Sequence, residues 1–493
     1  MIPAQQPPAT DASRKTRPLT LTEAVIPIAA LIVLVGMSFY LFGDAGAKGP
    51  NQVALVLAAM VALVIGRRAG FTTDELREAA IASVGTGVGA IFILFAVGAL
   101  TGAWAMSGTL MAMVYYGLQL LSPHYFYMTT AIICGIVAFS IGSSWTVAAT
   151  IGVGLVGIAV NMELSPAVTA GAVISGAYFG DKSSPLSDTA NLAAAVAGAD
   201  LYQHIREVLW TSVPALAITL LIFFFMGAPG DFDATEKLDN IRKTFDVSLI
   251  HFLPLVVVVV MAAIRIPPFT TIMMGALAGA VLAVFTAPER VIAFAAAPDL
   301  WTPLALLKGA WLALASGYTS TTGYEVLDQL ASRGGMERML DTVWLIIAAL
   351  AFGGIVEKAG VIERLIAPVL AAVKSNGGLV AATVTSTIAT NIVTADQYIA
   401  IVLPGRMFKD AFRQRGLAPV VVSRSLGDSA TVSSALIPWN SCGAFMAATL
   451  GVATVAYAPF TFFNILSPLL SIAMGVLGIR MLKLDSSAAG SKP

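Results

Sequence analysis

The stretch Ser175–Asn191, which reads SGAYFGDKSSPLSDTAN, interrupts a chain that is otherwise mostly apolar. It brings together three charged residues, five Ser and Thr hydroxyls, an Asn and the helix-breaking Pro185. A second polar stretch, Ser423–Asn440 (SRSLGDSATVSSALIPWN), lies in the other half of the chain. Charges and broken helices are costly at membrane depth unless they line a cavity or meet partners. The two stretches therefore predict a binding site inside a membrane protein.

The composition excludes a soluble globular protein. Of the 493 residues, 57% are hydrophobic and only 11% are charged, whereas a soluble domain carries about 25% charged residues. The apolar runs are continuous, as in Ala24–Phe42 and Leu253–Ile264, and do not alternate as the strands of a membrane β-barrel do. We therefore predict an all-α polytopic membrane protein with about ten to twelve transmembrane helices, each of the length that spans a bilayer.

Several other classes of protein lack support in the sequence. The net charge is zero, so there is no basic signal for nucleic acid. The two cysteines, Cys134 and Cys442, lie in apolar surroundings and do not suggest a disulfide or metal framework. The sequence contains no HExxH, GxSxG or GxxxxGK[ST] motif. We therefore expect neither an enzyme nor an ATP-driven pump, and no cofactor beyond transported ions.

Basic residues predict the orientation of the chain in the membrane. Arg14, Lys15 and Arg17 precede the first apolar segment, and Arg480 and Lys483 follow the last one. Because cytoplasmic loops are enriched in Lys and Arg, both termini should be cytoplasmic and the number of crossings even. We predict an N-terminal tail at residues 1–23, a transporter domain at 24–484 and a C-terminal tail at 485–493. The transporter domain should contain two repeat halves, at roughly 65–226 and 310–479.

The polar interruptions recur along the chain. Aligning Asp181 with Asp428 gives an offset of 247 (428 − 181), and the same offset places Ser144 on Asn391. Ser144 and Asn391 are both polar breaks in apolar runs. Each lies 37 residues before the Asp of its own half (181 − 144 and 428 − 391). Matching interruptions in two halves are typical of transporters built from structural repeats, whose broken helices form the binding site.

The polar breaks contain residue types that suit a small cation and a proton. A carboxylate can hold either a proton or the counter-charge of Na⁺, while hydroxyls and amides add neutral oxygen ligands. The ion- or proton-binding candidates are Asp181, Asp188, Asp428, Asn191, Asn391, Thr431, Ser144, Thr146 and Asn440. Among them, the candidate Na⁺ ligands are Asp181, Asp428 and Asn391. The candidates for positioning a substrate are Lys182, Thr394, Asp396 and Trp439.

Structural roles are the alternatives for these residues. Asp181 and Lys182 could form an ion pair at a helix end, and Asp188 could cap a helix N-terminus. Ser144 could hydrogen-bond to its own helix, as Ser and Thr often do. Trp439 could shape a cavity or simply pack between helices.

At these stretches the sequence resembles the NhaC-type Na⁺/H⁺ antiporter family of the ion transporter superfamily. The resemblance runs from about Ile65 to Ile479 and is carried by Ser175–Asn191, by DQYIAIVLPGRMF at 396–408 and by LIPWNSCGAFMAATLGV at 436–452. The family motif falls on Asp181, Lys182, Ser187, Asp188, Thr189, Asn191, Asn391, Asp396, Gln397, Asp428, Thr431, Trp439 and Asn440.

The resemblance implies secondary active exchange of Na⁺ for H⁺ by alternating access, in the inner membrane of a bacterium. It also admits a Na⁺- or H⁺-coupled exchanger of a small organic anion or amino acid, such as malate and lactate. The expected partners are Na⁺ and H⁺ or such an anion, together with the lipid bilayer, and a homodimer is one candidate assembly.

Overall fold

The computed structural model describes residues 16–43, 49–227, 235–245, 247–324, 328 and 331–484. Within these ranges the regular structure is helical, apart from a single bridge between Leu417 and Lys483. Nine described helices are long and apolar enough to cross a membrane, or up to eleven if two bent pairs are each counted as a span. The predicted all-α polytopic class is confirmed. The C-terminal tail and the first 15 residues of the N-terminal tail lie outside the described residues.

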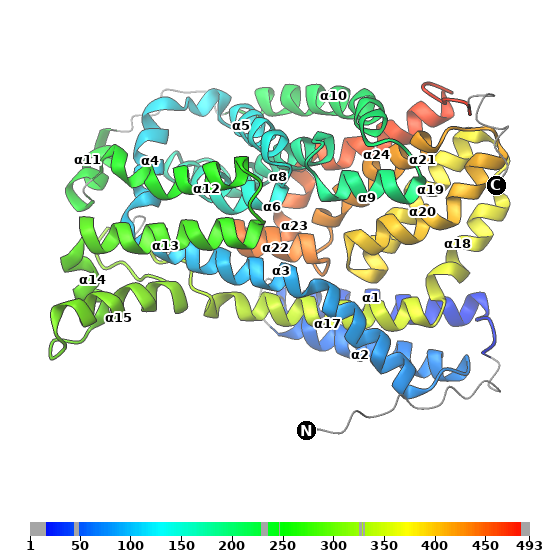
Figure 1. Ribbon diagram of the computed structural model, residues 1–493, viewed down its shortest axis with the longest axis horizontal. Coiled ribbons are helices and arrows are strands. Elements are labelled where there is room, and N and C mark those ends of the chain that lie inside the picture. The colour runs from blue at the N-terminus through cyan, green and yellow to red at the C-terminus, as the bar shows by residue number, and fades with distance from the viewer. Residues whose placement is uncertain are drawn as a thin grey trace.

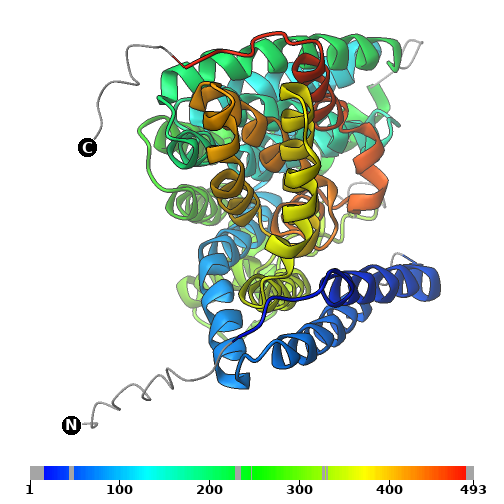
Figure 2. The ribbon, with the colours of Figure 1, turned by 90° about the vertical axis from the view of Figure 1, so that its right-hand side faces the viewer.

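Long helices form one side of the molecule. Thr20 and Thr72 each cap a helix start in a capping box with a Glu three residues later, which fixes where α1 and α3 begin. In this layer α1 packs on α2, α2 on α17, and α17 on α3, along the lower edge of Figure 1. Figure 2 shows α1 and α2 projecting from the rest of the bundle. The helices are α1 (Leu21–Phe42), α2 (Pro50–Arg68), α3 (Thr73–Ser107) and α17 (Leu340–Lys358).

A second group of helices continues from α3. The helix α13 packs along α3, α12 packs on α13, and α15 packs on α14. The described part of the segment between residues 288 and 341 contains the helices α14 and α15. The group, at the left of Figure 1, comprises α4 (Thr109–Leu120), α11 (Thr235–Thr244), α12 (Leu253–Ala263), α13 (Pro268–Thr286), α14 (Pro288–Ala295) and α15 (Thr302–Ala315).

The core of the molecule is made of interrupted helices. In the first half, α5 (Phe126–Ile141) stops at Gly142 and the chain restarts at Ser144 in α6. A short α6 (Ser144–Val147), a π-turn and α7 (Val153–Asn161) follow without a gap. Then α8 (Pro166–Ser183) stops, four residues cross the break, and α9 begins at Asp188.

The second half repeats this plan. A break separates α19 (Asn376–Thr394) from α20 (Gln397–Gln414). The next helix, α21 (Pro419–Leu426), continues through a π-turn at Gly427–Thr431, and a break then precedes α22. In Figure 1 the helices that begin after the breaks, such as α6, α9 and α22, lie between α10 and α3. The remaining core helices are α9 (Asp188–Ala197), α10 (Leu201–Phe225), α18 (Val361–Ala372), α22 (Ser441–Leu450), α23 (Thr454–Tyr457) and α24 (Phe462–Val476).

The breaks of the two halves match at an offset of 253, not at the 247 expected from the sequence. Gly142 and Ala395 both end a helix with a positive φ (395 − 142 = 253). The helix caps Ser143 and Asp396, Ser187 and Asn440, and Gly198 and Gly451 keep the same spacing, as do the first residues of α8 and α21, Pro166 and Pro419. Asp181 therefore matches Ser434, and Asp428 matches Ser175.

Close packing of the first half depends on small residues. Helices α5 and α8 lie against each other along their length. A Cβ atom at Gly176 would lie 2.1 Å from the carbonyl oxygen of Ala131, and one at Gly180 would lie 2.4 Å from that of Gly135. Such contacts leave no room for a side chain, and close backbone approach is how helices associate in lipid. They hold the end of α8, and with it Asp181, in a defined position.

Candidate functional site

A cavity of about 350 Å³ lies where the breaks of the two halves meet. We call it the inter-repeat cavity. The starts of α6, α9, α20 and α22 all contribute to it, and α3 supplies one wall. Its lining contains three carboxylates and, among the described residues, no Lys or Arg. The lining residues are Thr86, Gly87, Gly89, Ala90, Ile93, Ser143, Ser144, Trp145, Asp181, Asp188, Pro268, Asp396, Gln397, Tyr398 and Ser441.

Asp181 is the buried one of the two carboxylates that the first half contributes to the cavity. Its side chain is 6% exposed, and its Oδ2 accepts hydrogen bonds from the Ser144 hydroxyl at 2.6 Å and the Ser144 backbone N–H at 3.2 Å. Ser144 is the first residue of α6, where backbone N–H groups lack helical partners and the helix dipole is positive. The second oxygen, Oδ1, accepts no hydrogen bond from any described residue. The two bonds from Ser144 hold Oδ2 in place, and Oδ1 is left for a proton or a cation.

Asp188 connects the two halves. It is the first residue of α9, and its Oδ1 accepts from the N–H of Thr189 at 2.8 Å. Its Oδ2 accepts a hydrogen bond from the hydroxyl of Tyr398, on α20, at 2.6 Å. Asp188 also lines a neighbouring cavity of about 400 Å³ at the turn between α12 and α13, which includes Thr146 and Arg265. Asp188 thus lies at the junction of two hollow spaces.

Asp396 is the second half's own carboxylate at the cavity. It caps the start of α20, where its Oδ1 accepts from the N–H of Ile399 at 2.9 Å, and it is 5% exposed. The next residue, Gln397, accepts a hydrogen bond from the Ser434 hydroxyl at 3.3 Å. Both residues line the cavity, and Gln397 is the repeat match of Ser144 (397 − 144 = 253). Asp188 and Asp396 therefore lie at the starts of their own helices, where the dipole stabilises negative charge, while Asp181 lies in the last turn of α8 and contacts the start of α6.

Other predicted residues hold the second break together and do not line the cavity. The amide of Asn391 donates to the carbonyl of Ala430 and to the hydroxyl of Ser433. Asn440 caps α22 and donates to both the backbone and the side-chain oxygen of Asn391. The Trp439 indole donates to the carbonyl of Ile392 at 2.8 Å. These bonds satisfy the backbone groups that an interrupted helix leaves free.

The remaining neutral candidates bond close to their own positions. Thr394 donates to the carbonyls of Thr390 and Asp396, and Thr146 donates to the hydroxyl of Ser143. Asn191 donates to the carbonyls of Ser187 and Pro185, within the turn that starts α9. Thr431 is buried in the π-turn after α21. Of this group, Thr146 borders the cavity beside the α12–α13 turn, and none of the four lines the inter-repeat cavity.

Lys182 and Asp428 form an ion pair away from the inter-repeat cavity. Their Nζ and Oδ1 atoms are 2.6 Å apart, and the side chains are 1% and 0% exposed. Thr211 donates to the same Oδ1 at 2.7 Å, and Lys182 donates to Ser467 at 2.6 Å. The expected Na⁺ ligand set of Asp181, Asp428 and Asn391 is therefore divided, because Lys182 already supplies the positive charge that Asp428 needs. Among the described residues no group of three or more His, Cys, Asp or Glu side chains could hold a metal ion.

Two kinds of residue escaped the sequence analysis. Tyr398 lies in the quoted stretch 396–408, and it would have been singled out had the repeat been aligned at 253, where it matches the cavity residue Trp145. Thr211 and Ser467 lie in largely apolar stretches of α10 and α24, beside other hydroxyl residues such as Ser212 and Ser471. Nothing in their sequence context separates them from hydroxyls that bond to their own helix, so only the fold identifies them.

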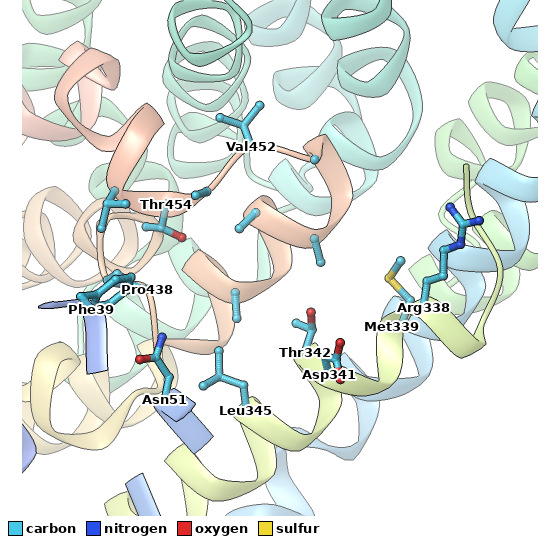
Figure 3. A pocket seen from close by; sticks show the side chains of 16 residues that line it. Phe39, Asn51, Arg338, Met339, Asp341, Thr342, Leu345, Pro438, Val452 and Thr454 are labelled. Carbon is cyan, nitrogen blue, oxygen red and sulfur yellow. The ribbon is translucent and has the colours of Figure 1, made fainter. Parts of the chain in front are cut away.

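A separate cavity of about 270 Å³ lies between the end of α1, the starts of α2 and α17, and α22. Figure 3 shows Asn51, Thr342 and Leu345 on one wall and Val452 on the opposite one. Much of its lining is small and apolar, from α22 and the turn after it. Asp341 is the one carboxylate among the described residues of this lining, and Arg338 lines the same space, so the cavity lacks the purely acidic charge of the inter-repeat cavity.

The fold and the cavity define the class of protein. A helical membrane protein whose two repeats present broken helices and carboxylates to a shared cavity is a secondary transporter. The chain belongs to the Na⁺/H⁺ antiporter family, whose sequence profile matches residues 176–479. The resemblance drawn from the motifs is thereby confirmed.

Individual relatives cover nearly the whole chain. It is 36% identical to the Na⁺/H⁺ antiporter NhaC of Alkalihalophilus pseudofirmus, over 94% of this chain and 98% of the relative. It is 35% identical to NhaC of Bacillus subtilis, over 86% and 91% of the two chains. The malate-2H⁺/Na⁺-lactate antiporter of Bacillus subtilis is 33% identical, over 93% and 95%. These relatives are transporters and not enzymes.

Proposed function

We propose that the protein exchanges Na⁺ for H⁺ across the membrane by alternating access, with the inter-repeat cavity as the cation site. The observation that carries this proposal is the lining of the cavity, which holds Asp181, Asp188 and Asp396 and no Lys or Arg among the described residues. A water-accessible space whose charged side chains are all negative concentrates cations and repels anions. The relatives named NhaC support the choice of Na⁺ and H⁺.

The ligands for Na⁺ are proposed from the hydrogen bonds. Asp181 keeps Oδ1 without a partner among the described residues, while Ser144 holds Oδ2 in place. Asp188 is oriented by Tyr398 from the other half. Relative movement of the halves would therefore change the distance between Asp181 and Tyr398, and with it the cation site. Moving one net charge against 100 mV involves about 2.3 kcal/mol, so any stoichiometry other than one-for-one makes exchange voltage-sensitive.

The setting of the protein completes the proposal. We place it in a bacterial inner membrane with both termini in the cytoplasm, because basic residues flank the first and last apolar segments. The start of α1 and the last described residues lie at the same end of the molecule, at the right of Figure 1, which supports this orientation. A homodimer is the candidate assembly, and light scattering of the purified protein in detergent would measure it.

Proton movement in proteoliposomes tests the proposed exchange. Vesicles that contain the protein and an internal pH dye are given Na⁺ or Li⁺ after a pH gradient is set. The parent should move protons on addition of either ion, and Asp181→Asn should not. Absence of a proton response in the parent would contradict Na⁺/H⁺ exchange, and an Asp181→Asn variant that behaves like the parent would contradict the site.

A carrier of a small organic anion is the second candidate. The cavity of about 350 Å³ is larger than a single ion needs, and Arg265 lines the adjoining space that shares Asp188. Such a guanidinium could pair with a substrate carboxylate next to the bound cation. The named malate/lactate exchanger among the relatives fits this alternative. Thermal-shift measurements with malate, lactate and amino acids, each with and without Na⁺, separate the two candidates.

A further inference from the structure

The cavity of about 270 Å³ shown in Figure 3 is a slot between two helix faces, and we call it the α17–α22 slot. One face belongs to the start of α17 and the turn before it, and the other belongs to α22. The residues of each face follow the i, i+3, i+4, i+7 spacing of one helix side: Arg338, Asp341, Thr342 and Leu345, and Ala444, Ala447, Ala448 and Gly451. Seven helical residues rise about 10 Å, so the slot is long enough for a small metabolite.

The α17 face carries one charge of each sign. Arg338 and Asp341 are one turn apart and both exposed at the slot, yet no ion pair joins these two described side chains. Arg338 donates from Nη1 to the carbonyl of Ser332 at 3.0 Å, which leaves Nη2 and Nε for another acceptor. The Asp341 carboxylate has no hydrogen-bond or ion-pair partner among the described residues. A guanidinium and a carboxylate that stand open one turn apart complement a ligand that carries both charges.

Asn51, at the start of α2, adds a buried acceptor to the slot. It is 5% exposed, and its Oδ1 accepts no hydrogen bond from any described residue. The next residue, Gln52, donates from Nε2 to the backbone carbonyl of Asp341 at 2.9 Å and so holds the start of α2 against the start of α17. Figure 3 shows Asp341 between Asn51 and Arg338 along the slot. A buried acceptor without a donor costs free energy, which an N–H group of a ligand would recover.

The rest of the slot is largely apolar. The α22 face contributes alanine and glycine only, and Phe39 and Leu345 lie at the end away from Arg338 in Figure 3. A second guanidinium borders the last turn of α22, where a Cβ atom on Gly451 would lie 3.7 Å from Nη1 of Arg333. The slot thus combines an apolar groove with a guanidinium at one end, and with a carboxylate and a buried amide oxygen along its floor.

We propose that the α17–α22 slot binds a free amino acid with an apolar side chain. The carboxylate of the amino acid pairs with the Arg338 guanidinium, and its ammonium donates to the Asp341 carboxylate and to Oδ1 of Asn51. Its side chain lies along the alanines of α22, where burial of apolar surface adds to the affinity. A zwitterion gives each of the three polar groups a partner, whereas a simple anion meets like charge at Asp341 and a simple amine meets like charge at Arg338.

This site is distinct from the cation site and does not depend on the proposed exchange. The slot and the inter-repeat cavity share no lining residue in the described part of the chain. They have α22 in common, which begins at the inter-repeat cavity with Ser441 and faces the slot from Ala444 onward. A bound amino acid therefore occupies none of the space around Asp181, and its binding is measured without transport.

Calorimetry with the purified parent protein in detergent tests the ligand class. L-leucine should bind, and its affinity should be the same with and without Na⁺. Two analogues keep the leucine side chain and each lose one charge: 4-methylpentanoate lacks the ammonium, and 3-methylbutylamine lacks the carboxylate. Each should bind at least about 10-fold more weakly than leucine, because a hydrogen-bonded charge contact is lost. An analogue that binds as tightly as leucine, or a parent that binds no leucine, overturns the proposal.

Substitutions in the slot locate the ligand. Asn51→Leu removes the buried acceptor, and Asp341→Asn removes the charge that faces the ammonium. Each should weaken leucine binding by about 10-fold or more. Asp299→Asn is the matched control, because Asp299 is an exposed acid that lines none of the cavities described above, and this variant should bind leucine as the parent does. Unchanged binding in Asn51→Leu and Asp341→Asn, or an equal loss in Asp299→Asn, overturns the proposal.

A steric variant completes the test. Ala448→Leu narrows the slot without changing a charge, so a folded Ala448→Leu protein that binds leucine as the parent does overturns the proposal. If thermal unfolding shows that this variant does not fold, the analogues on the parent and the Asn51→Leu variant decide. A leucine affinity that requires Na⁺ indicates a transported substrate in the inter-repeat cavity and also overturns the assignment. A parent that binds leucine in the slot but exchanges no Na⁺ for H⁺ contradicts the proposed function instead.

Discussion

The two halves of the molecule share the same breaks but place different groups at them. In the first half the Ser144 hydroxyl donates to the Asp181 carboxylate at 2.6 Å. In the second half, at the matching positions 253 residues later, Ser434 donates to the amide oxygen of Gln397 at 3.3 Å. The paired residues are 37 positions apart in both halves. A charged contact in one repeat is thus a neutral contact in the other.

This difference shows how a symmetric scaffold carries an asymmetric site. The second half does have a carboxylate at the cavity, but Asp396 stands where the first half has the cap Ser143. It therefore bonds to its own helix start, while Asp181 bonds across a break to a different helix. A charge that bridges two segments responds to their relative movement, and one that caps its own helix does not. The first half should accordingly dominate cation binding.

The largest expected effect comes from removing the charge of the first half. Asp181→Asn should weaken the apparent affinity for Na⁺ by about 100-fold or more, because loss of one partner of a buried ion pair costs about 3–5 kcal/mol. Ser434→Ala, at the matching position, should change it by less than about 10-fold, since only one neutral hydrogen bond is lost. Na⁺ titrations of proton flux in proteoliposomes measure both. Equal losses in the two variants would contradict the asymmetry.

A smaller effect is expected at the contact between the halves. Tyr398→Phe removes the hydroxyl that donates to Asp188, and a hydrogen bond to a charged group is worth about 1.5–3 kcal/mol, or roughly 10-fold to 100-fold in affinity. The matching residue is Trp145, whose indole N–H has no hydrogen-bond partner among the described residues. Trp145→Phe keeps the stacking on Phe445 and should bind Na⁺ nearly as the parent does. The same Na⁺ titration compares them.

The residues that end α5 and α19, at the first break of each half, provide a stability test. Gly142 has φ of +75°, and a Cβ atom there would lie 2.7 Å from Leu186. Gly142→Ala should therefore destabilise the protein by at least the ~1–2 kcal/mol that a left-handed residue costs. At the matching position Ala395 already adopts φ of +57°, so Ala395→Gly should be neutral or slightly stabilising. Thermal unfolding in detergent measures the two; a destabilised Ala395→Gly would mean that its methyl group packs usefully.

The smallest effect concerns a carboxylate that belongs to neither set of breaks. Burial alone would raise the pKa of Asp328, but hydrogen bonds from the Thr322 N–H and hydroxyl and the Gly323 N–H outweigh it and lower that pKa. A lowered pKa adds stability that is complete above the unfolded value of about 3.9 and is lost as the pH falls through the folded value.

Asp328→Asn should therefore lower the melting temperature slightly at pH 7, and the difference from the parent should shrink toward pH 3. Na⁺/H⁺ exchange should be unchanged, because the residue lies outside the inter-repeat cavity. Thermal scans at the two pH values and one transport assay are sufficient. A loss of transport would show that carboxylates outside the breaks also bind the cation.

Much of the fold follows from local sequence. Continuous apolar runs predicted the helices, and polar or helix-breaking residues marked where they stop, as at Ser144 and Pro185. The repeat was also visible, but its register was placed at 247 because Asp181 and Asp428 were matched by their charge. Chemistry diverges faster than backbone geometry, so the caps at Ser187 and Asn440 are the better markers of equivalent positions.

The sequence by itself determined that this is a polytopic helical protein with polar breaks, because lipid permits charge and broken helices only where they are enclosed. Only the tertiary structure decided which charges meet. Asp181 and Lys182 are consecutive, yet one faces the inter-repeat cavity and the other pairs with Asp428. Partners such as Tyr398 and Thr211 come from helices far away in the chain, and their approach depends on how those helices pack.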